Sequence, residues 1–78
     1  MKDLIEFIST SLVDDPTQVE VAEIRRGSQV TLKLQVGKED MGRVIGKGGR
    51  VANAMRTLLR VTAAQEGKRA TLDIVEPR

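Results

Sequence analysis

The chain is organised around one stretch, Arg43-Val44-Ile45-Gly46-Lys47-Gly48-Gly49-Arg50. This stretch holds three of the chain's seven glycines within four positions, with one lysine between them and an arginine on either side. Glycine tolerates positive φ and admits another backbone at close range, and it costs conformational entropy wherever it is not needed. We therefore expect a turn whose main chain contacts a ligand. The basic side chains make a phosphate group the favoured ligand.

The composition outlines a single small domain spanning residues 1–78, with 40% hydrophobic and 31% charged residues. The absence of cysteine favours a reducing cytoplasm, and no apolar run or leader predicts a membrane span or a signal peptide. Histidine, cysteine, tyrosine and tryptophan are all missing, which removes most general bases, soft metal ligands and activated nucleophiles. We therefore expect no enzyme, no cofactor and no metal site. With Phe7 as the one aromatic residue, modules that stack bases on aromatic platforms are poor fits.

The charges are distributed unevenly along the chain. Residues 1–42 hold five basic and eight acidic side chains, whereas residues 43–69 hold seven basic side chains against one acidic. A basic segment that begins at the glycine turn is typical of a protein with a polyanionic partner. The alternative is that helices often carry arginine on a solvated face.

The first part of the chain predicts a structural helix. Asp3, with Glu6 three positions later, indicates a capping box at the start, and Pro16 ends the helix. Helical spacing predicts one apolar face that consists of Leu4, Ile5, Phe7, Ile8 and Leu12.

Two strands are expected next. Alternation with a period of two begins at Thr17, but Ala22 and Ile24 fall on the opposite parity from Val21. The first strand therefore has either a bulge near Ala22 or apolar groups on both faces. A reversal at Arg26-Gly27-Ser28 leads into a cleaner strand, with apolar residues at Val30, Leu32, Leu34 and Val36.

The remaining segment predicts a short helix of about two turns, the glycine turn, a longer helix to roughly Gln65, and a last strand. The expected apolar face of the longer helix is Val51, Ala54, Met55, Leu58 and Thr62, with Arg50, Asn53, Arg56 and Arg60 largely off that face. Gly67 is a plausible C-cap residue, and Pro77 closes the strand of Ala70, Leu72 and Ile74. The predicted fold class is α+β in the order α-β-β-α-α-β, with one three-stranded sheet and helices packed on one face.

Three glycine motifs compete for the turn. A P-loop requires G-x-x-x-x-G-K-(S/T) after a strand, but here Gly42 and Gly46 are one position too close, Gly48 follows Lys47, and a helix precedes. A dinucleotide-binding G-x-G-x-x-G lacks its last glycine and its strand–turn–helix–strand context. The G-x-x-G of residues 46–49, between two helices, remains.

At this point the chain resembles the KH domain, whose fingerprint is V-I-G-x-x-G. The order of elements is similar to the type II arrangement of bacterial KH proteins, and the resemblance covers almost the whole chain. Among small bacterial KH proteins, residues 40–50 resemble the KhpA (YlqC) family, whose pattern is G-R-V-I-G-(K/R)-x-G-R. The resemblance implies that about four nucleotides of single-stranded RNA run across the turn.

A phosphate contact at the turn is also expected from helix geometry. Free amides and the positive end of the second helix dipole meet at the turn, and Arg43, Lys47 and Arg50 add attraction to phosphates. The expected site is Arg43 to Val51, in which Gly46, Gly48 and Gly49 contact phosphates. The resemblance implies that the bases lie in an apolar groove, for which Val44, Ile45, Val51 and Ala54 are the candidates. For Ile45 and Val51, core packing is an equally good interpretation, and Met55 and Leu58 are expected in the core.

The resemblance implies a cytoplasmic RNA chaperone or post-transcriptional regulator. It also implies self-association as a homodimer and pairing with a larger KH-containing protein of the KhpB (Jag, EloR) type. We expect Leu59 and Val61, which lie off the predicted core stripe, to form part of that association surface. Two alternatives remain open: a protein-interaction module with little RNA binding of its own, and a ribosome-associated KH protein.

Overall fold

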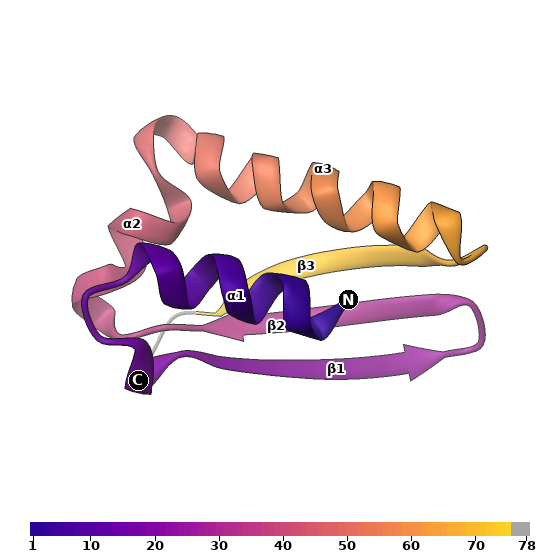
Figure 1. The fold of residues 1–78 in the computed structure, drawn as a ribbon, viewed down its shortest axis with the longest axis horizontal. Helices are drawn as coiled ribbons and strands as arrows, with labels where there is room; N and C mark the ends of the chain where they lie inside the picture. The colour runs from indigo at the N-terminus through magenta and orange to yellow at the C-terminus, as the bar shows by residue number, and fades with distance from the viewer. Residues whose placement is uncertain (76–78) are drawn as a thin grey trace.

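The computed structural model describes residues 1–75, without the side chain of Lys47. Its helices and strands follow the predicted order (Figure 1), with 3₁₀ turns in addition, and the expected strand end at Pro77 lies outside the described residues. The elements are α1 (Lys2–Leu12), η1 (Pro16–Gln18), β1 (Glu20–Arg26), β2 (Gln29–Gln35), η2 (Lys38–Asp40), α2 (Met41–Ile45), η3 (Lys47–Gly49), α3 (Arg50–Gln65) and β3 (Arg69–Val75).

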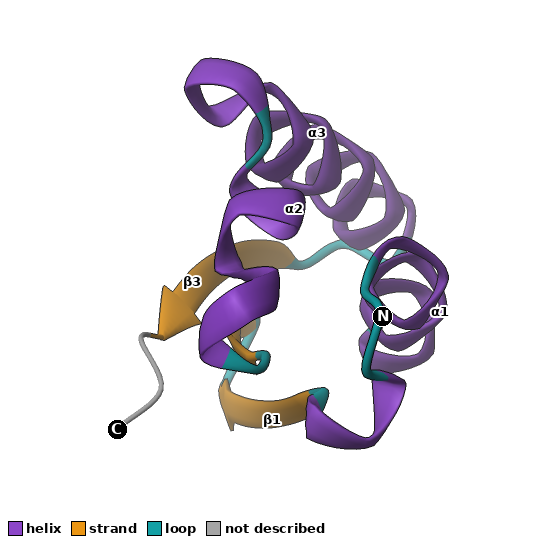
Figure 2. Ribbon diagram, turned by 90° about the vertical axis from the view of Figure 1, so that its left-hand side faces the viewer, coloured by secondary structure: helices purple, strands orange, loops and turns teal. Residues whose placement is uncertain are grey.

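The three strands form one mixed sheet in the order β1-β2-β3. Strand β1 pairs antiparallel with β2, and β3 pairs parallel with β2 after the crossover through α2 and α3. The helices cover one face of this sheet and leave the other face open (Figure 2). The α+β class and the type II-like KH arrangement are therefore confirmed.

The core lies between the sheet and the helices. Its fully buried side chains are Ile5, Val30, Leu32, Leu34, Val36, Val44, Met55, Leu59 and Leu72. Burial of each large aliphatic side chain contributes roughly 1.5–3 kcal/mol. The alternation predicted from Val30 to Val36 places all four of its apolar residues in this core, so β2 is the strand on which the two layers meet.

The structure corrects the predicted start of α1 and the predicted course of the chain into β1. Asp3 is not the cap of α1, because the helix starts at Lys2 with Met1 in the N-cap position and no side chain caps it. Pro16 does follow the end of α1, but it opens a 3₁₀ turn capped by the side chain of Asp15, and β1 begins only at Glu20. The parity change in β1 is not a bulge, because every residue from Glu20 to Arg26 has one partner in β2. Ile24 instead lies exposed on the face opposite Val21.

The predicted core stripe of α3 is wrong by about a quarter of a helical turn. The buried residues of α3 are Ala52, Met55, Leu59 and Ala63. Of the predicted stripe, only Met55 is buried, while Ala54 and Leu58 are exposed. Leu59, expected on an association surface, is a core residue with 0% exposure. The helix carries apolar side chains over a wider arc than the core uses.

None of the helices in the described part of the chain is long and apolar enough to cross a membrane.

Candidate nucleic-acid interface

The turn between α2 and α3 depends on three glycines with positive φ. Gly46 has φ 61° and ψ 152°, Gly48 has φ 67° and ψ 24°, and Gly49 has φ 87° and ψ 9°. L-residues other than Asn and Asp rarely adopt such angles. Since an ordinary helix end needs one glycine of this kind, three in four residues indicate a backbone shaped for a further purpose.

The three glycines serve different local needs. A Cβ on Gly46 would overlap the side chain of Val51, coming within 2.9 Å of its Cβ and closer to its Cγ2. A Cβ on Gly48 would meet nothing within 4 Å, and one on Gly49 would meet only the amide nitrogen of Asn53 at 3.9 Å. Gly46 therefore allows the first turn of α3 to pack against the end of α2. Gly48 and Gly49 leave the outer side of the turn open to a ligand.

Amides at this junction are only partly used within the chain. The amide of Gly46 donates to the carbonyl of Gly42 at 2.8 Å, and that of Gly49 donates to the carbonyl of Gly46 at 2.6 Å. Helix α3 has Gly49 in its N-cap position, so no side chain there accepts from its first amides, and its first turn has no acidic residue. The first turn contains Arg50 instead, which is exposed. Such a helix start favours an anion from outside.

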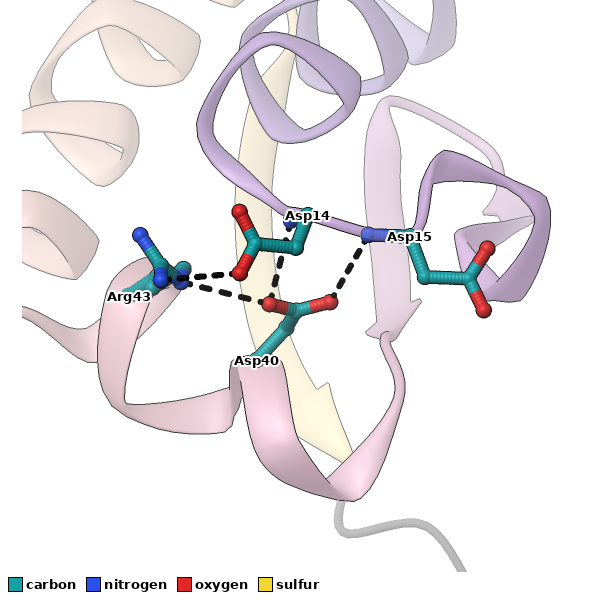
Figure 3. Close-up of polar contacts among 4 residues, drawn as sticks. All are labelled: Asp14, Asp15, Asp40 and Arg43. Atoms are coloured by element: carbon teal, nitrogen blue, oxygen red, sulfur yellow. Dashed lines mark hydrogen bonds and ion pairs between the residues drawn. The ribbon is translucent and has the colours of Figure 1, made fainter.

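Arg43 has a different environment from the one expected. Its Nη2 lies 2.9 Å from a carboxylate oxygen of Asp14, and its Nε lies 3.3 Å from a carboxylate oxygen of Asp40 (Figure 3). The Asp40 carboxylate is buried and also accepts from the amides of Asp14 at 3.1 Å and Asp15 at 3.2 Å. Arg43 and Asp40 thus tie the start of α2 to the segment after α1. The local sequence does not reveal these contacts, because the two amides lie 25 and 26 residues away from Asp40.

The expected apolar floor divides into buried and accessible positions. Val44 is fully buried and belongs to the core, whereas Ile45 is 40% exposed and Val51 is half-buried. Ile45 and Val51 flank the glycine turn on its two sides, so they are the accessible apolar side chains next to it in the chain. Ala54 is exposed one helical turn further along α3.

The sequence pattern did not distinguish the two flanks of α3 that the structure shows. One flank lies along β3, where the Nε of Arg56 donates to the carbonyl of Leu72 at 3.2 Å and its Nη1 lies 3.4 Å from the side-chain oxygen of Asn53. The other flank carries Ala54, with Leu58 at 49% exposure and Val61 at 55%. At 3.6 residues per turn, Leu58 and Arg56 point in nearly opposite directions across the helix.

Comparison with known proteins yields one consistent result. A family model described as the KH domain of KhpA and KhpB matches residues 2–74. The RNA-binding protein KhpA of Clostridium acetobutylicum is 47% identical over 96% of this chain and all of its own length. The protein of that name from Caldanaerobacter subterraneus is 45% identical over 96% of this chain and all of its own length. The one from Aquifex aeolicus is 41% identical over 97% of this chain and 96% of its own length.

Proposed function

The chain belongs to the KhpA/KhpB KH-domain family, and we propose that it acts as one KH domain that binds single-stranded RNA through the turn of residues 46–49. The observation that carries this proposal is the turn itself. Three glycines at positive φ place an open backbone, without a side-chain cap, at the start of α3. The likeness to proteins named RNA-binding protein KhpA supports RNA as the partner.

Phosphate groups are the proposed contact at the turn. Amides at the start of α3 donate to phosphate oxygens, and Arg50 and Lys47 supply positive charge. Such contacts do not read the base sequence, and each neutralised phosphate makes the affinity more dependent on salt. Because Arg43 is already paired with two carboxylates, we assign it to holding α2 and the turn in position.

Bases of the same strand are proposed to lie over Ile45 and Val51. A G-x-x-G loop of this kind holds about four nucleotides, and the sequence contains no tyrosine or tryptophan and one phenylalanine on which bases could stack. Phe7 belongs to α1 and not to the turn or the helices that flank it. The domain should therefore bind weakly and with little preference for sequence. This behaviour suits an RNA chaperone or post-transcriptional regulator in the cytoplasm, without catalytic activity.

A second copy of the domain is the proposed occupant of the exposed apolar flank of α3, formed by Ala54, Leu58 and Val61. Exposed aliphatic side chains at positions i, i+4 and i+7 form one strip, and a strip of this kind gains by being covered. The family model describes KH domains of both KhpA and KhpB, so the same flank is proposed to pair with a larger KhpB-type protein. Two joined domains raise the effective concentration of the second turn for one RNA strand.

The test replaces the turn's outer residues without disturbing its geometry. In the double variant Lys47→Asp, Gly48→Asp, the new Cβ at Gly48 enters open space, and Asp tolerates left-handed angles better than most residues. We expect an unchanged far-UV circular dichroism spectrum and loss of binding to a short fluorescent single-stranded RNA in anisotropy titrations. The control is Lys38→Asp, which reverses an exposed charge elsewhere. Retained RNA affinity in the folded double variant would refute the proposed site and favour the protein-interaction alternative.

A further inference from the structure

The sheet has one face that none of the described helices covers (Figure 2). Because Val30, Leu32 and Leu34 are buried on the helix side, the side chains between them along β2 point to the uncovered face. Residues opposite each other in paired strands share a face, and the hydroxyl of Thr71 accepts from the side-chain amide of Gln29 at 3.1 Å there. From the hairpin end, the rows of this face are Arg26–Gln29–Arg69, Ile24–Thr31–Thr71, Ala22–Lys33–Asp73 and Glu20–Gln35–Val75.

Positive charge gathers on the half of this face near the β1–β2 hairpin. Arg26 and Arg69 stand at the two edges of the first row, and Lys33 stands two rows further along on the central strand. Between them lies a shallow hollow of about 260 Å³, lined by Ile24, Arg26, Gln29, Thr31 and Lys33. Its lining includes two cations and no carboxylate. We call the hollow together with Arg69 the open-face patch.

The cations of the open-face patch are not neutralised within the described residues. The ion pairs of residues 1–75 join Lys2, Arg25 and Arg43 to their acids and include no cation of the patch. Asp73 is the register partner of Lys33, but it forms no ion pair with it there. The other carboxylate of this face stands in the row farthest from the hairpin. Such a patch concentrates an anionic partner.

We propose that the open-face patch binds the phosphate backbone of a second RNA segment, while a first segment lies on the glycine turn. This inference rests on the proposed RNA binding at residues 46–49. Two rows separate Arg26 from Lys33, which is about 14 Å along the strands and matches about four phosphates at about 3.4 Å each.

The chemistry of the patch favours an RNA backbone over an acidic protein segment. Between the cations lie Gln29, Thr31 and Thr71, whose amide and hydroxyl groups suit phosphate oxygens. Protein segments are anchored mainly by large side chains in well-packed pockets, and the one large apolar side chain of the hollow is Ile24. Contacts of this kind hold a strand in place without reading its bases.

The patch and the turn are far apart on the molecule. The turn lies at the opposite end of the long axis from the hairpin (Figure 1), and this axis extends over 35 Å. The turn also belongs to the helix side, whereas the patch belongs to the uncovered side of the sheet (Figure 2). Four nucleotides on the turn span about 14 Å, so they leave the patch free. One domain can therefore hold two short RNA segments at once, as an RNA chaperone that brings strands together requires.

The test is a titration of the ¹⁵N-labelled protein with an unstructured RNA of about four nucleotides, the length that fits the turn. Main-chain amide signals report where each binding event occurs. The variant Arg26→Gln, Lys33→Gln removes two charges of the patch from exposed positions. Arg69 is left in place because it also lines a hollow beside α3. The control Lys2→Gln, Arg25→Gln removes the same net charge from exposed ion pairs elsewhere, which contribute little to stability.

We expect two events in the wild type and in the control. The first moves the signals of residues 44–51, and the second, at higher RNA concentration, moves those of residues 24–33. The variant of the patch should keep the first event and lose the second. Two phosphate contacts give a slope of log affinity against log salt of about 1.4, so fourfold more salt should weaken the second event about sevenfold.

Three results would overturn the inference. A wild type with one event, at the turn, means that the patch does not bind RNA. A second event that survives in the variant of the patch means that other residues carry it. Equal losses in the variant and the control mean that net charge, and not the patch, attracts the second RNA. Absence of the first event alone would instead refute the proposed function at the turn, so the two failures are distinguishable.

Discussion

Replacement of Gly46 by alanine is expected to destabilise the fold more strongly than the same replacement at Gly48. Both glycines have positive φ, but only at Gly46 does the added Cβ overlap a neighbour, Val51. The angles of Gly46 belong to a region used almost only by glycine, which costs about 1–3 kcal/mol for another residue. Overpacking against Val51 adds about 1–3 kcal/mol. Alanine also lowers the conformational entropy of the unfolded chain relative to glycine, which offsets about 0.4–1 kcal/mol of these costs.

The net destabilisation expected for Gly46→Ala is therefore about 2–5 kcal/mol, against a total stability of about 4–12 kcal/mol for a domain of this size. For Gly48→Ala, the left-handed angle costs about 1–2 kcal/mol and no overlap is added, so the net loss is about 1 kcal/mol. Urea unfolding followed by far-UV circular dichroism measures both, since the chain has no tryptophan or tyrosine to report by fluorescence.

A second substitution separates the two causes. Val51→Ala in the Gly46→Ala background removes the closest overlapping atom, the Cγ2 of Val51, and leaves its Cβ in place, so a double-mutant cycle should show a favourable coupling between the two sites of about 1 kcal/mol. The φ angle is unaffected by Val51 and its cost should remain. Equal destabilisation by Gly46→Ala and Gly48→Ala, or the absence of coupling to Val51, would show that the turn does not depend on close packing at Gly46.

Two more outcomes test the surfaces that the fold assigns. The double variant Leu58→Glu, Val61→Glu should stay folded and shift the mass in light scattering to that of a monomer; an unchanged mass would contradict the proposed interface. Leu59→Ala should instead lose about 2–5 kcal/mol of stability, because it leaves a cavity in the core. Asp40→Ala should destabilise the fold by about 1–3 kcal/mol, because it leaves two main-chain amides without their acceptor. Asp14→Ala breaks only an exposed ion pair and should cost less than about 1 kcal/mol. Thermal unfolding measures both, and equal effects would mean that the buried carboxylate of Asp40 does not stabilise the fold more than the exposed one does.

Local patterns in the sequence predicted much of the fold. The glycines of the turn, the alternation from Val30 to Val36 and the reversal at Gly27 each act over a few residues, and the structure has a turn, a strand and a hairpin there. The order of elements then leaves few ways to bury the apolar faces.

The rotation of α3 was not predictable in the same way. Its apolar side chains cover an arc that includes both Leu58 and Leu59, and the pattern alone does not say which part of a wide arc meets the sheet. The small residues Ala52 and Ala63 gave little signal although both are buried. The surplus of apolar residues, now seen to be exposed, is what supports an association surface on this helix.

Contacts between distant segments explain the other features of the structure that the sequence did not predict. Ser9 is fully buried, with its hydroxyl 4.0 Å from the sulfur of Met55, and Asp40 accepts from the amides of Asp14 and Asp15. Neither partnership is visible in the local sequence. The assignment of Arg43 to phosphate binding came from its position beside the glycines, and its carboxylate partners became apparent only in three dimensions.

The opposed flanks of α3 have a thermodynamic consequence. Arg56 and Arg60 lie about half a helical turn from Leu58, with the flank toward β3 on one side and the apolar flank on the other. A partner that covers Leu58 and Val61 therefore leaves the flank toward β3 uncovered, and the phosphate contacts proposed at the glycine turn use other residues. For an RNA too short to reach a second turn, linkage between assembly and RNA binding should be weak, with a coupling free energy close to zero. On this basis, assembly multiplies the number of sites per particle and leaves the intrinsic affinity of each one unchanged.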